Sequence, residues 1–256
     1  MKSNLILELA KRDFTERYAG SVLGIFWAFI WPFVMIAIYT LVFSRVMGAK
    51  LPGISSIYSY SIYLIAGLLP WTAFSNTVIR ASTVFLDKRN LISKVSMTLP
   101  RLPMYVVISE TVTFVVSMLI YFLFMLVIQT PVSYKLLLLV PFIYVVQQIF
   151  AFAIGFLCAT LSVFLHDLRE LVNIIIQLWF WFTPIVYMKE LLPPFAQRLL
   201  LLNPATYFID AYHSIFFFNQ LPDFRLLILL TIMGHVLLLL SYTFFKKLEK
   251  EVRDFL

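Results

Sequence analysis

The sequence predicts an all-α polytopic membrane protein with six transmembrane helices, and three observations support this fold class. Hydrophobic residues occupy 62% of the 256 positions and charged residues only 13%, whereas soluble domains average about 25% charged residues. Apolar stretches of membrane-spanning length recur along the chain. Lysine and arginine gather on one side of those stretches. We therefore expect residues 1–256 to form a single transmembrane domain.

Six stretches reach the roughly 20 apolar residues that a helix needs to cross a hydrocarbon core about 30 Å thick. The predicted spans are residues 22–46, 60–86, 104–128, 136–165, 171–187 and 226–245. The fifth span is short and the fourth is long, so we expect tilt or local irregularity in both.

The cations predict the orientation of these spans. Thirteen lysines and arginines fall in segments on one side of the predicted membrane and six on the other, while Arg80 lies within the second span. Cytoplasmic segments carry the excess of such residues, and the number of spans is even, so both termini are expected in the cytoplasm. This topology also explains the net charge of +7 better than nucleic-acid binding does, because the cations are scattered between apolar spans.

The N-terminal segment, residues 1–19, has the pattern of an amphipathic helix in the cytoplasmic membrane interface. Ile6, Leu9 and Phe14 fall on one helical face, and charged residues such as Lys11 occupy the other. Membrane anchoring alone and anchoring combined with contact to a partner fit this pattern equally well.

Residues 86–103 form a second basic and amphipathic segment on the predicted cytoplasmic side. Leu91 and Ile92 give it a short apolar stripe among cations, and Pro100 and Pro103 end it before the third span. Composition alone favours a loop that only fixes topology over a docking element for a cytoplasmic partner.

Residues 189–225, on the predicted outer side, are unusually apolar for a loop. Two proline-containing breaks, at residues 193–194 and 203–204, divide the segment into pieces of about ten residues, too short to span a bilayer. Irregular backbone at membrane depth is tolerated only where protein buries it or where it lines a cavity. We therefore predict a pair of short re-entrant or interfacial helices, with a plain extracellular amphipathic helix as the alternative.

Motifs for soluble catalysis and metal binding are missing from the sequence. It has no G-x-x-x-x-G-K-[ST] motif and hence no phosphate-binding loop of its own. Its histidines, His166, His213 and His235, are far apart, and a hydrogen-bonding role for His213 near Asp210 is favoured over a metal site. No metal site and no catalytic residue are predicted.

Ionisable groups inside membrane spans are functional hypotheses by default, and this chain has few of them. Glu110 lies about 9 Å into the third span at 1.5 Å per residue, where it could pair with Arg80. A chain of carboxylates and histidines at the midplane, as a proton-coupled pump needs, is missing. Coupling to an ion gradient is therefore poorly supported.

Aromatic residues give the strongest positive signal: 26 Phe, 13 Tyr and 5 Trp. Trp27 fits an interfacial belt, but Trp31 lies about 14 Å beyond Val22, near mid-membrane. Core packing and the lining of a sugar path by aromatic faces explain that depth equally well. Pro32 cannot donate a hydrogen bond to the carbonyl of Ala28, so we expect a kink or a free acceptor beside Trp31.

Three stretches give the chain a family resemblance: RYAGSVLGIFWAFIWPF at residues 17–33, FWFTPIVY at 180–187 and NPATYFIDAYHSIF at 203–216. The first stretch contains a basic residue, then Ser-x-Leu-Gly, then Trp and Pro, which is a pattern shared by one family of membrane proteins. The residues that match the pattern are Arg17, Ser21, Leu23, Gly24, Trp27 and Pro32. The chain thus resembles the membrane subunit of an ABC-2-type exporter, most closely the permease of O-antigen and polysaccharide ABC transporters. The resemblance covers nearly the whole chain.

The resemblance implies a homodimeric channel and assigns three groups of site residues. Spans one and five would form a lateral gate and substrate path, with candidates Trp27, Trp31, Pro32, Tyr39, Trp179, Trp181 and Tyr187. The N-terminal helix, residues 86–100 and, as a lesser contact, the HDLRE turn at residues 166–170 would dock a separate cytoplasmic ATPase, with candidates Arg12, Arg17, Lys88, Arg89, Leu91, Lys94, Asp167 and Arg169. The short outer helices would close the outer end, with candidates Pro193, Pro194, Asn203, Pro204, Tyr207, Asp210 and Tyr212.

The function so implied is export of lipid-linked, O-antigen-like polysaccharide across the bacterial inner membrane. The chain would be a transport subunit and not an enzyme, since ATP and Mg²⁺ would be bound by two copies of the partner ATPase. Two alternatives share parts of this pattern: an ABC-2 exporter of teichoic acid, lipid or drug, and an ion-coupled flippase of lipids or glycolipids.

Overall fold

In the computed structural model, residues 2–46, 48, 56–94, 98–130, 133–165 and 167–256 are described, and all regular elements among them are helices. The elements along the chain are α1 (Lys2–Glu16), η1 (Gly24–Phe26), α2 (Trp27–Thr40), η2 (Leu41–Val46), α3 (Ser59–Ser82), α4 (Val84–Asp87), α5 (Arg89–Ile92), η3 (Leu99–Arg101), α6 (Met104–Val127), α7 (Tyr134–Leu137), α8 (Val140–Ser162), α9 (Leu168–Trp181), η4 (Lys189–Leu191), α10 (Pro194–Leu200), α11 (Pro204–Phe216) and α12 (Phe224–Phe255). The predicted all-α fold class is confirmed for these residues.

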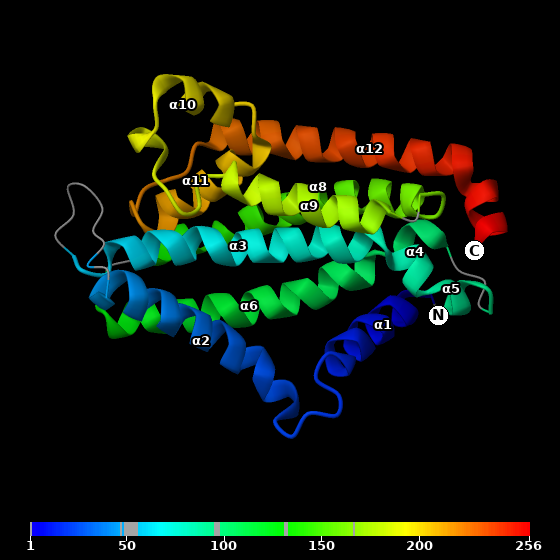
Figure 1. The fold of residues 1–256 in the computed structure, drawn as a ribbon, viewed down its shortest axis with the longest axis horizontal. Coiled ribbons are helices and arrows are strands. Elements are labelled where there is room, and N and C mark those ends of the chain that lie inside the picture. Colours follow the sequence, from blue (N-terminus) through cyan, green and yellow to red (C-terminus); the bar gives the residue numbers. More distant parts are fainter. Residues whose placement is uncertain (1, 47, 49–55, 95–97, 131–132, 166) are drawn as a thin grey trace.

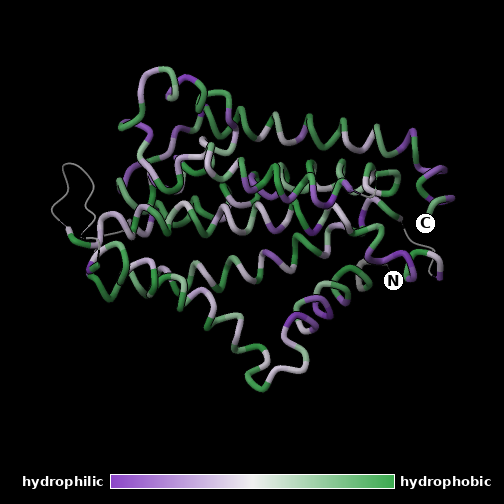
Figure 2. Tube along the Cα trace, viewed as in Figure 1, coloured by the Kyte–Doolittle hydropathy of each residue, from purple (hydrophilic) through white to green (hydrophobic). Residues whose placement is uncertain are grey.

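The long helices lie side by side in an elongated bundle (Figure 1). Both chain termini lie at one end of it, beside α4 and α5, and we call this the terminal end; the opposite end, with α10, is the distal end. Hydrophilic residues gather along α1 and at the last turns of α12, both at the terminal end (Figure 2). Such a distribution suits a bundle whose middle lies in hydrocarbon.

Five of the six predicted spans coincide with helices long and apolar enough to cross a membrane. They are Gly24–Val46, Ser59–Ser82, Leu99–Val127, Tyr134–Ser162 and Phe224–Phe255. The other predicted span, residues 171–187, overlaps α9, which has only 14 residues, Leu168–Trp181. At 1.5 Å per residue it is about 21 Å long, shorter than the hydrocarbon core. Pro184 accounts for the end, since proline donates no hydrogen bond and disfavours helical backbone at the preceding residue.

Helix α3 forms the centre of the bundle. Protein buries 72% of its apolar stretch, against 17% for the first span, which contains α2. Small residues bring α3 and α8 close together: a Cβ built on Gly155 of α8 would lie 2.6 Å from the Cβ of Ala81. No side chain larger than hydrogen fits at this crossing.

A separate hydrophobic cluster holds the terminal end together. Leu9 of α1, Phe85 of α4, Phe156 of α8 and Phe245 of α12 are among its buried members. The four helices are far apart in sequence, so this cluster fixes α1 against the spans and keeps α4 and α5 beside it.

The chain turns sharply between α1 and α2. Gly20 and Gly24 both have positive φ values, 79° and 50°, in the region that glycine adopts without steric cost. Ser21 accepts a hydrogen bond from Nε1 of Trp27 at 2.8 Å. The two glycines thus form an elbow, which joins α1 to the first span. The helix then continues through Pro32 to Thr40, and its last turns, Leu41–Val46, are a π-helix.

Candidate functional site

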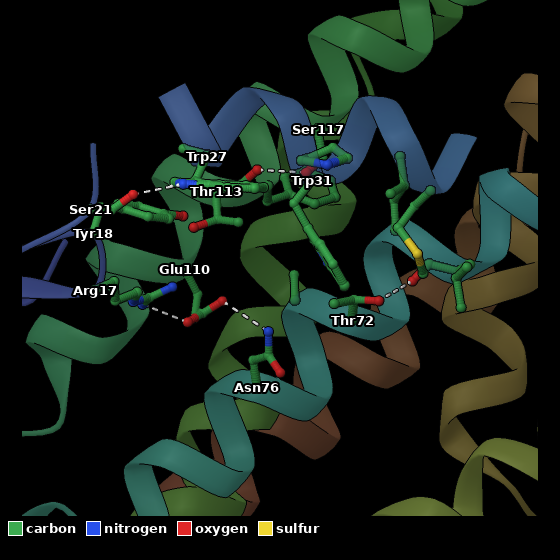
Figure 3. A pocket seen from close by; sticks show the side chains of 17 residues that line it. Arg17, Tyr18, Ser21, Trp27, Trp31, Thr72, Asn76, Glu110, Thr113 and Ser117 are labelled. Atoms are coloured by element: carbon green, nitrogen blue, oxygen red, sulfur yellow. Dashed lines mark hydrogen bonds and ion pairs between the residues drawn. The ribbon is translucent and has the colours of Figure 1, made fainter. Parts of the chain in front are cut away.

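A cavity of about 520 Å³ lies between the elbow, α2, α3 and α6. One wall is aromatic and comes from α2, and the residues facing it on α3 and α6 include hydroxyl and amide side chains (Figure 3). The lining residues are Arg17, Tyr18, Ser21, Trp27, Ala28, Trp31, Pro32, Met35, Leu68, Leu69, Thr72, Ala73, Asn76, Glu110, Thr113, Phe114 and Ser117. Three predicted path residues, Trp27, Trp31 and Pro32, therefore share one cavity.

Arg17 and Glu110 form the floor of the cavity. Together with Asp13 and Arg80 behind them they make a cluster of four charged side chains, which we call the charge cluster. Oε1 of Glu110 contacts Nη2 of Arg17 at 2.7 Å and Nη1 of Arg80 at 2.5 Å. Asp13 pairs with both arginines, and its distance to Arg17 is 3.2 Å. The predicted pairing of Arg80 with Glu110 is confirmed, and the structure adds Asp13 and Arg17 from the N-terminal segment.

Burial makes the charge cluster energetically important. The Glu110 side chain is 1% exposed, and Ser109 Oγ donates a hydrogen bond to Oδ2 of Asp13 at 2.5 Å. Burial on its own raises the pKa of Asp13, but hydrogen bonds from Ser109 and Arg80 and the arginine charges outweigh it. The net result is a pKa below the ordinary value, so Asp13 is ionised at neutral pH. Two cations therefore face two anions.

The aromatic wall combines exposed and buried rings. Trp31 is 64% exposed and Trp27 is 39% exposed, although both line the cavity. Phe114, opposite them on α6, is buried and stacks on Tyr144 with ring centroids 4.0 Å apart. The wall on α6 is thus rigid, while the α2 indoles present ring surface to the cavity and to the outside.

The other predicted path residues lie elsewhere. Tyr39 stacks against Phe43 near the distal end of α2. Trp179 packs edge-on against Trp71 of α3, and Trp181 is 60% exposed at the end of α9. Of the described residues that line the cavity, none comes from α9. Within one chain, the structure does not bring the aromatics of spans one and five together.

A second cavity of about 690 Å³ lies along α2 towards the distal end. Its lining is almost entirely apolar and is shared by α2, η2, Tyr58 and the last turns of α6, with Arg45 as its one charged residue among those described. It adds no polar cluster, so its chemistry is that of a hydrophobic groove.

The predicted ATPase-docking residues all lie at the terminal end, in different environments. Arg12 is exposed and pairs with Glu16, and Arg17 belongs to the charge cluster. The ammonium of Lys88 lies 5.5 Å from the ring centroid of Tyr105, and Nε of Arg89 donates to the carbonyl of Leu256 at 2.5 Å. Leu91 is partly buried; Lys94, Asp167 and Arg169 are exposed. Residues 95–97 of the docking segment and His166 lie outside the described part of the chain.

Among the predicted outer-gate residues, Asn203 has the most definite role. Its Oδ1 caps α11 through the backbone N–H of Ala205 and accepts from Nε1 of Trp179 at 2.7 Å. Its Nδ2 donates to the carbonyl of Phe182 at 2.8 Å, just past the end of α9. Pro204 follows at the first helical position, which suits proline. One amide thus joins the interrupted helix α9 to α11.

Of the remaining outer-gate candidates, some are buried in the helix bundle and others are exposed on the surface. Tyr212 is fully buried and donates to Oε1 of Gln147 at 3.0 Å, and Asp210 pairs with Lys189 at 2.6 Å. Tyr207 donates to the carbonyl of Leu201 at 2.6 Å, whereas Pro193 and Pro194 are exposed at the start of α10. Tyr212 therefore anchors α11 inside the bundle.

Tyrosines of α3 form hydrogen bonds with backbone carbonyls of the irregular segment that follows α9. Tyr60 donates to the carbonyl of Val186 at 2.6 Å, and Tyr63 lies within hydrogen-bonding distance of the carbonyls of Pro184 and Tyr187. His213, stacked on Tyr63, is fully buried, and burial lowers its pKa to about 3. It is neutral at physiological pH, and its Nε2 lies 3.0 Å from the carbonyl oxygen of Tyr63. No group of three or more potential metal ligands occurs in the described residues.

Sequence reasoning missed several members of the charge cluster and cavity. Asp13 was not among the predicted site residues, and Ser109, Asn76 and Thr72 carry no motif. The signal that could have found Asp13 is its place four residues before Arg17, next to an elbow rich in glycine.

The fold and cavity define a multi-span helical membrane protein with a polar site enclosed between its first three long helices. The sequence profile of the ABC-2 type transporter family matches residues 4–217. This chain belongs to the ABC-2 type transporter family.

Similar proteins align over nearly the full length. The O-antigen export system permease protein RfbA of Myxococcus xanthus is 31% identical over 253 residues, which cover 98% of this chain and 94% of the relative. An RfbA permease of Klebsiella pneumoniae is 27% identical, with 99% and 95% covered. A further Klebsiella pneumoniae RfbA permease is 26% identical over the same shares.

Proposed function

We propose that this chain is the channel-forming membrane subunit of an ATP-driven exporter that moves lipid-linked, O-antigen-like polysaccharide across the bacterial inner membrane. The observation that carries the proposal is similarity over nearly the whole chain to three permeases named for O-antigen export. The cavity beside Trp27 and Trp31 supports it, because aromatic faces with nearby hydroxyl groups suit sugars.

The proposed assembly contains two copies of this chain and two copies of a cytoplasmic ATPase, which binds ATP and Mg²⁺. In it, the terminal end faces the cytoplasm, and α1 lies in the membrane interface. Helix α9 and the irregular segment to residue 187 together make the fifth of six crossings. Asn203 and the α3 tyrosines support this arrangement, since they satisfy backbone groups that lipid could not.

Deleting the gene and restoring it tests the function directly. We expect the deletion strain to lose the surface polysaccharide and accumulate the lipid-linked glycan inside, and the wild-type gene to reverse both. Co-purification of the chain with the ATPase encoded beside it checks the partner. A deletion strain with normal surface glycan would refute the proposal.

Replacing Trp31 by alanine is expected to reduce polysaccharide export several-fold while the complex still assembles. The substitution removes an aromatic wall of the cavity, and Trp31 is 64% exposed, so little packing is lost. The measurement is surface glycan per unit of membrane-inserted protein. Phe26→Ala is the control, because Phe26 is 65% exposed and lines neither cavity. Equal export by the two variants would remove Trp31 from the path.

Reversing Lys88 and Arg89 to glutamate is expected to weaken ATPase binding at least several-fold. The double substitution changes the local charge by four units on the segment proposed to dock the ATPase. It also removes the contacts of these side chains with Tyr105 and Leu256. Pull-down of the ATPase measures the effect. The double variant Lys88→Met, Arg89→Met loses the same contacts without reversing charge, so intermediate binding is expected from it. Wild-type binding by the glutamate variant would contradict the docking role.

A further inference from the structure

The charges at the floor of the first cavity are already paired. Glu110 and Asp13 face Arg17 and Arg80, and the four ion pairs between them are all 3.2 Å or shorter. An anionic ligand entering there would meet the carboxylate of Glu110, and a cationic one the guanidinium of Arg17, both of which line the cavity. The floor therefore favours a neutral ligand that forms hydrogen bonds.

The same floor retains an acceptor that is not fully used. Oε1 of Glu110 takes both short ion-pair contacts, whereas Oε2 accepts from Nδ2 of Asn76 at 3.4 Å, a long distance for a hydrogen bond. Each carboxylate oxygen can accept two hydrogen bonds. Oε2 of Glu110 therefore has hydrogen-bonding capacity left for one further donor.

The walls also offer acceptors. Thr72 donates to the carbonyl of Leu68 at 2.8 Å, and Ser117 donates to that of Thr113 at 2.8 Å, each within its own helix. A hydroxyl that has donated its proton still has lone pairs with which to accept. A ligand that satisfies this cavity must therefore bring several hydrogen-bond donors of its own.

Aromatic rings supply the other half of the recognition. Trp27 has its N–H bound to Ser21, so the indole can offer its face without leaving a polar group unpaired. Trp31 lies one helical turn further along α2, on the same cavity. The ligand must therefore carry several hydroxyl donors on a ring whose C–H faces can stack on indoles. A sugar has both properties.

We propose that the cavity binds an uncharged sugar ring and discriminates against phosphate. This inference rests on the proposed function and narrows it: the site would hold a sugar of the lipid-linked glycan and not the phosphate of its lipid carrier. The volume of about 520 Å³ lies within the range of small-molecule sites.

Tryptophan fluorescence of the purified chain in phosphatidylcholine nanodiscs tests this proposal. Three probes with the same acyl chains are compared: monoglucosyl diacylglycerol, phosphatidic acid and diacylglycerol. We expect a saturable signal change with the glucosyl lipid and none with the other two. The double variant Trp27→Phe, Trp31→Phe should lose the signal. A response to phosphatidic acid equal to that of the glucosyl lipid would overturn the proposal, and so would no response to the glucosyl lipid.

Matched cavity-filling variants locate the site. Thr72→Phe fills the first cavity from an exposed position on α3, and Ala37→Phe fills the second cavity from an exposed position on α2. Thr72→Phe should raise the concentration of glucosyl lipid needed for half-saturation about tenfold, and Ala37→Phe should leave that concentration unchanged. Asn76→Leu, which removes an amide without adding bulk, is a second variant in case Thr72→Phe does not fold. Unchanged binding in the folded first-cavity variants would place the sugar elsewhere.

The two proposals fail in different ways. Wild-type protein that restores export but shows no sugar response would overturn the sugar site and leave the export function standing. Conversely, the purified protein could bind the glucosyl lipid while the deletion strain still displays normal surface glycan. That pair of results would overturn the export function and leave the sugar site standing.

Discussion

Replacing Glu110 by glutamine is expected to destabilise the protein by about 3–5 kcal/mol and to abolish export. Glutamine has the same shape but no charge, so Arg17 and Arg80 would be left with Asp13 as the only anion in the charge cluster. Breaking a buried pair leaves an uncompensated charge with its desolvation cost. Thermal unfolding of the purified protein measures the stability, and surface glycan measures the export.

Glu16→Gln is the matched control for this experiment. Glu16 pairs with Arg12 at 2.5 Å, but the two side chains are 48% and 74% exposed. An exposed pair contributes about 0–1 kcal/mol, so the control should unfold close to the wild-type temperature. Equal losses in Glu110→Gln and Glu16→Gln would show that the charge cluster has no special weight.

Replacing Gly155 by alanine is expected to cost about 1–3 kcal/mol, although alanine is the better helix former. The new methyl group would lie 2.6 Å from the Cβ of Ala81, and a Cβ cannot move without its backbone. The α3–α8 crossing at the centre of the bundle would therefore have to widen. The yield of folded protein and its unfolding temperature measure the effect.

Gly234→Ala, on α12, gives the opposite expectation. The nearest atom to its new Cβ is Cγ2 of Ile149 at 3.6 Å, an ordinary van der Waals contact. Without a clash, the helix propensity of alanine should make this variant equal to or slightly more stable than wild type. If Gly155→Ala were as stable as Gly234→Ala, close packing of α3 on α8 would not be required.

The helices and the pairing of Arg80 with Glu110 could be predicted from sequence because each depends on local rules. Long apolar stretches require helices in lipid, and a buried glutamate requires a cation within reach. Arg80 is the one cation inside the second span, so few alternatives existed. The helix break at residues 203–204 follows from its proline in the same way.

The rest depends on tertiary contacts that no local pattern encodes. Asp13 reaches Ser109 only because α1 folds back against α6 at the elbow. Helix α9 ends where Pro184 interrupts it, and Asn203 and the α3 tyrosines satisfy the freed carbonyls from 20 or more residues away. Hydropathy is averaged over a window longer than this break, so it does not detect the end of the helix. Residues 171–187 therefore looked like one continuous span.

The glycine elbow separates α1 from α2, so that two neighbours in sequence are distinct helices with different partners. Asp13 of α1 pairs with Arg80 of α3, and Arg17, the residue after α1, pairs with Glu110 of α6. The same chain continues into α2 through two glycines with positive φ. A force applied to α1 is therefore transmitted sideways, through Arg80 and Glu110, to two other helices. The chain reverses direction at the elbow, so no continuous helix carries a displacement of α1 into α2.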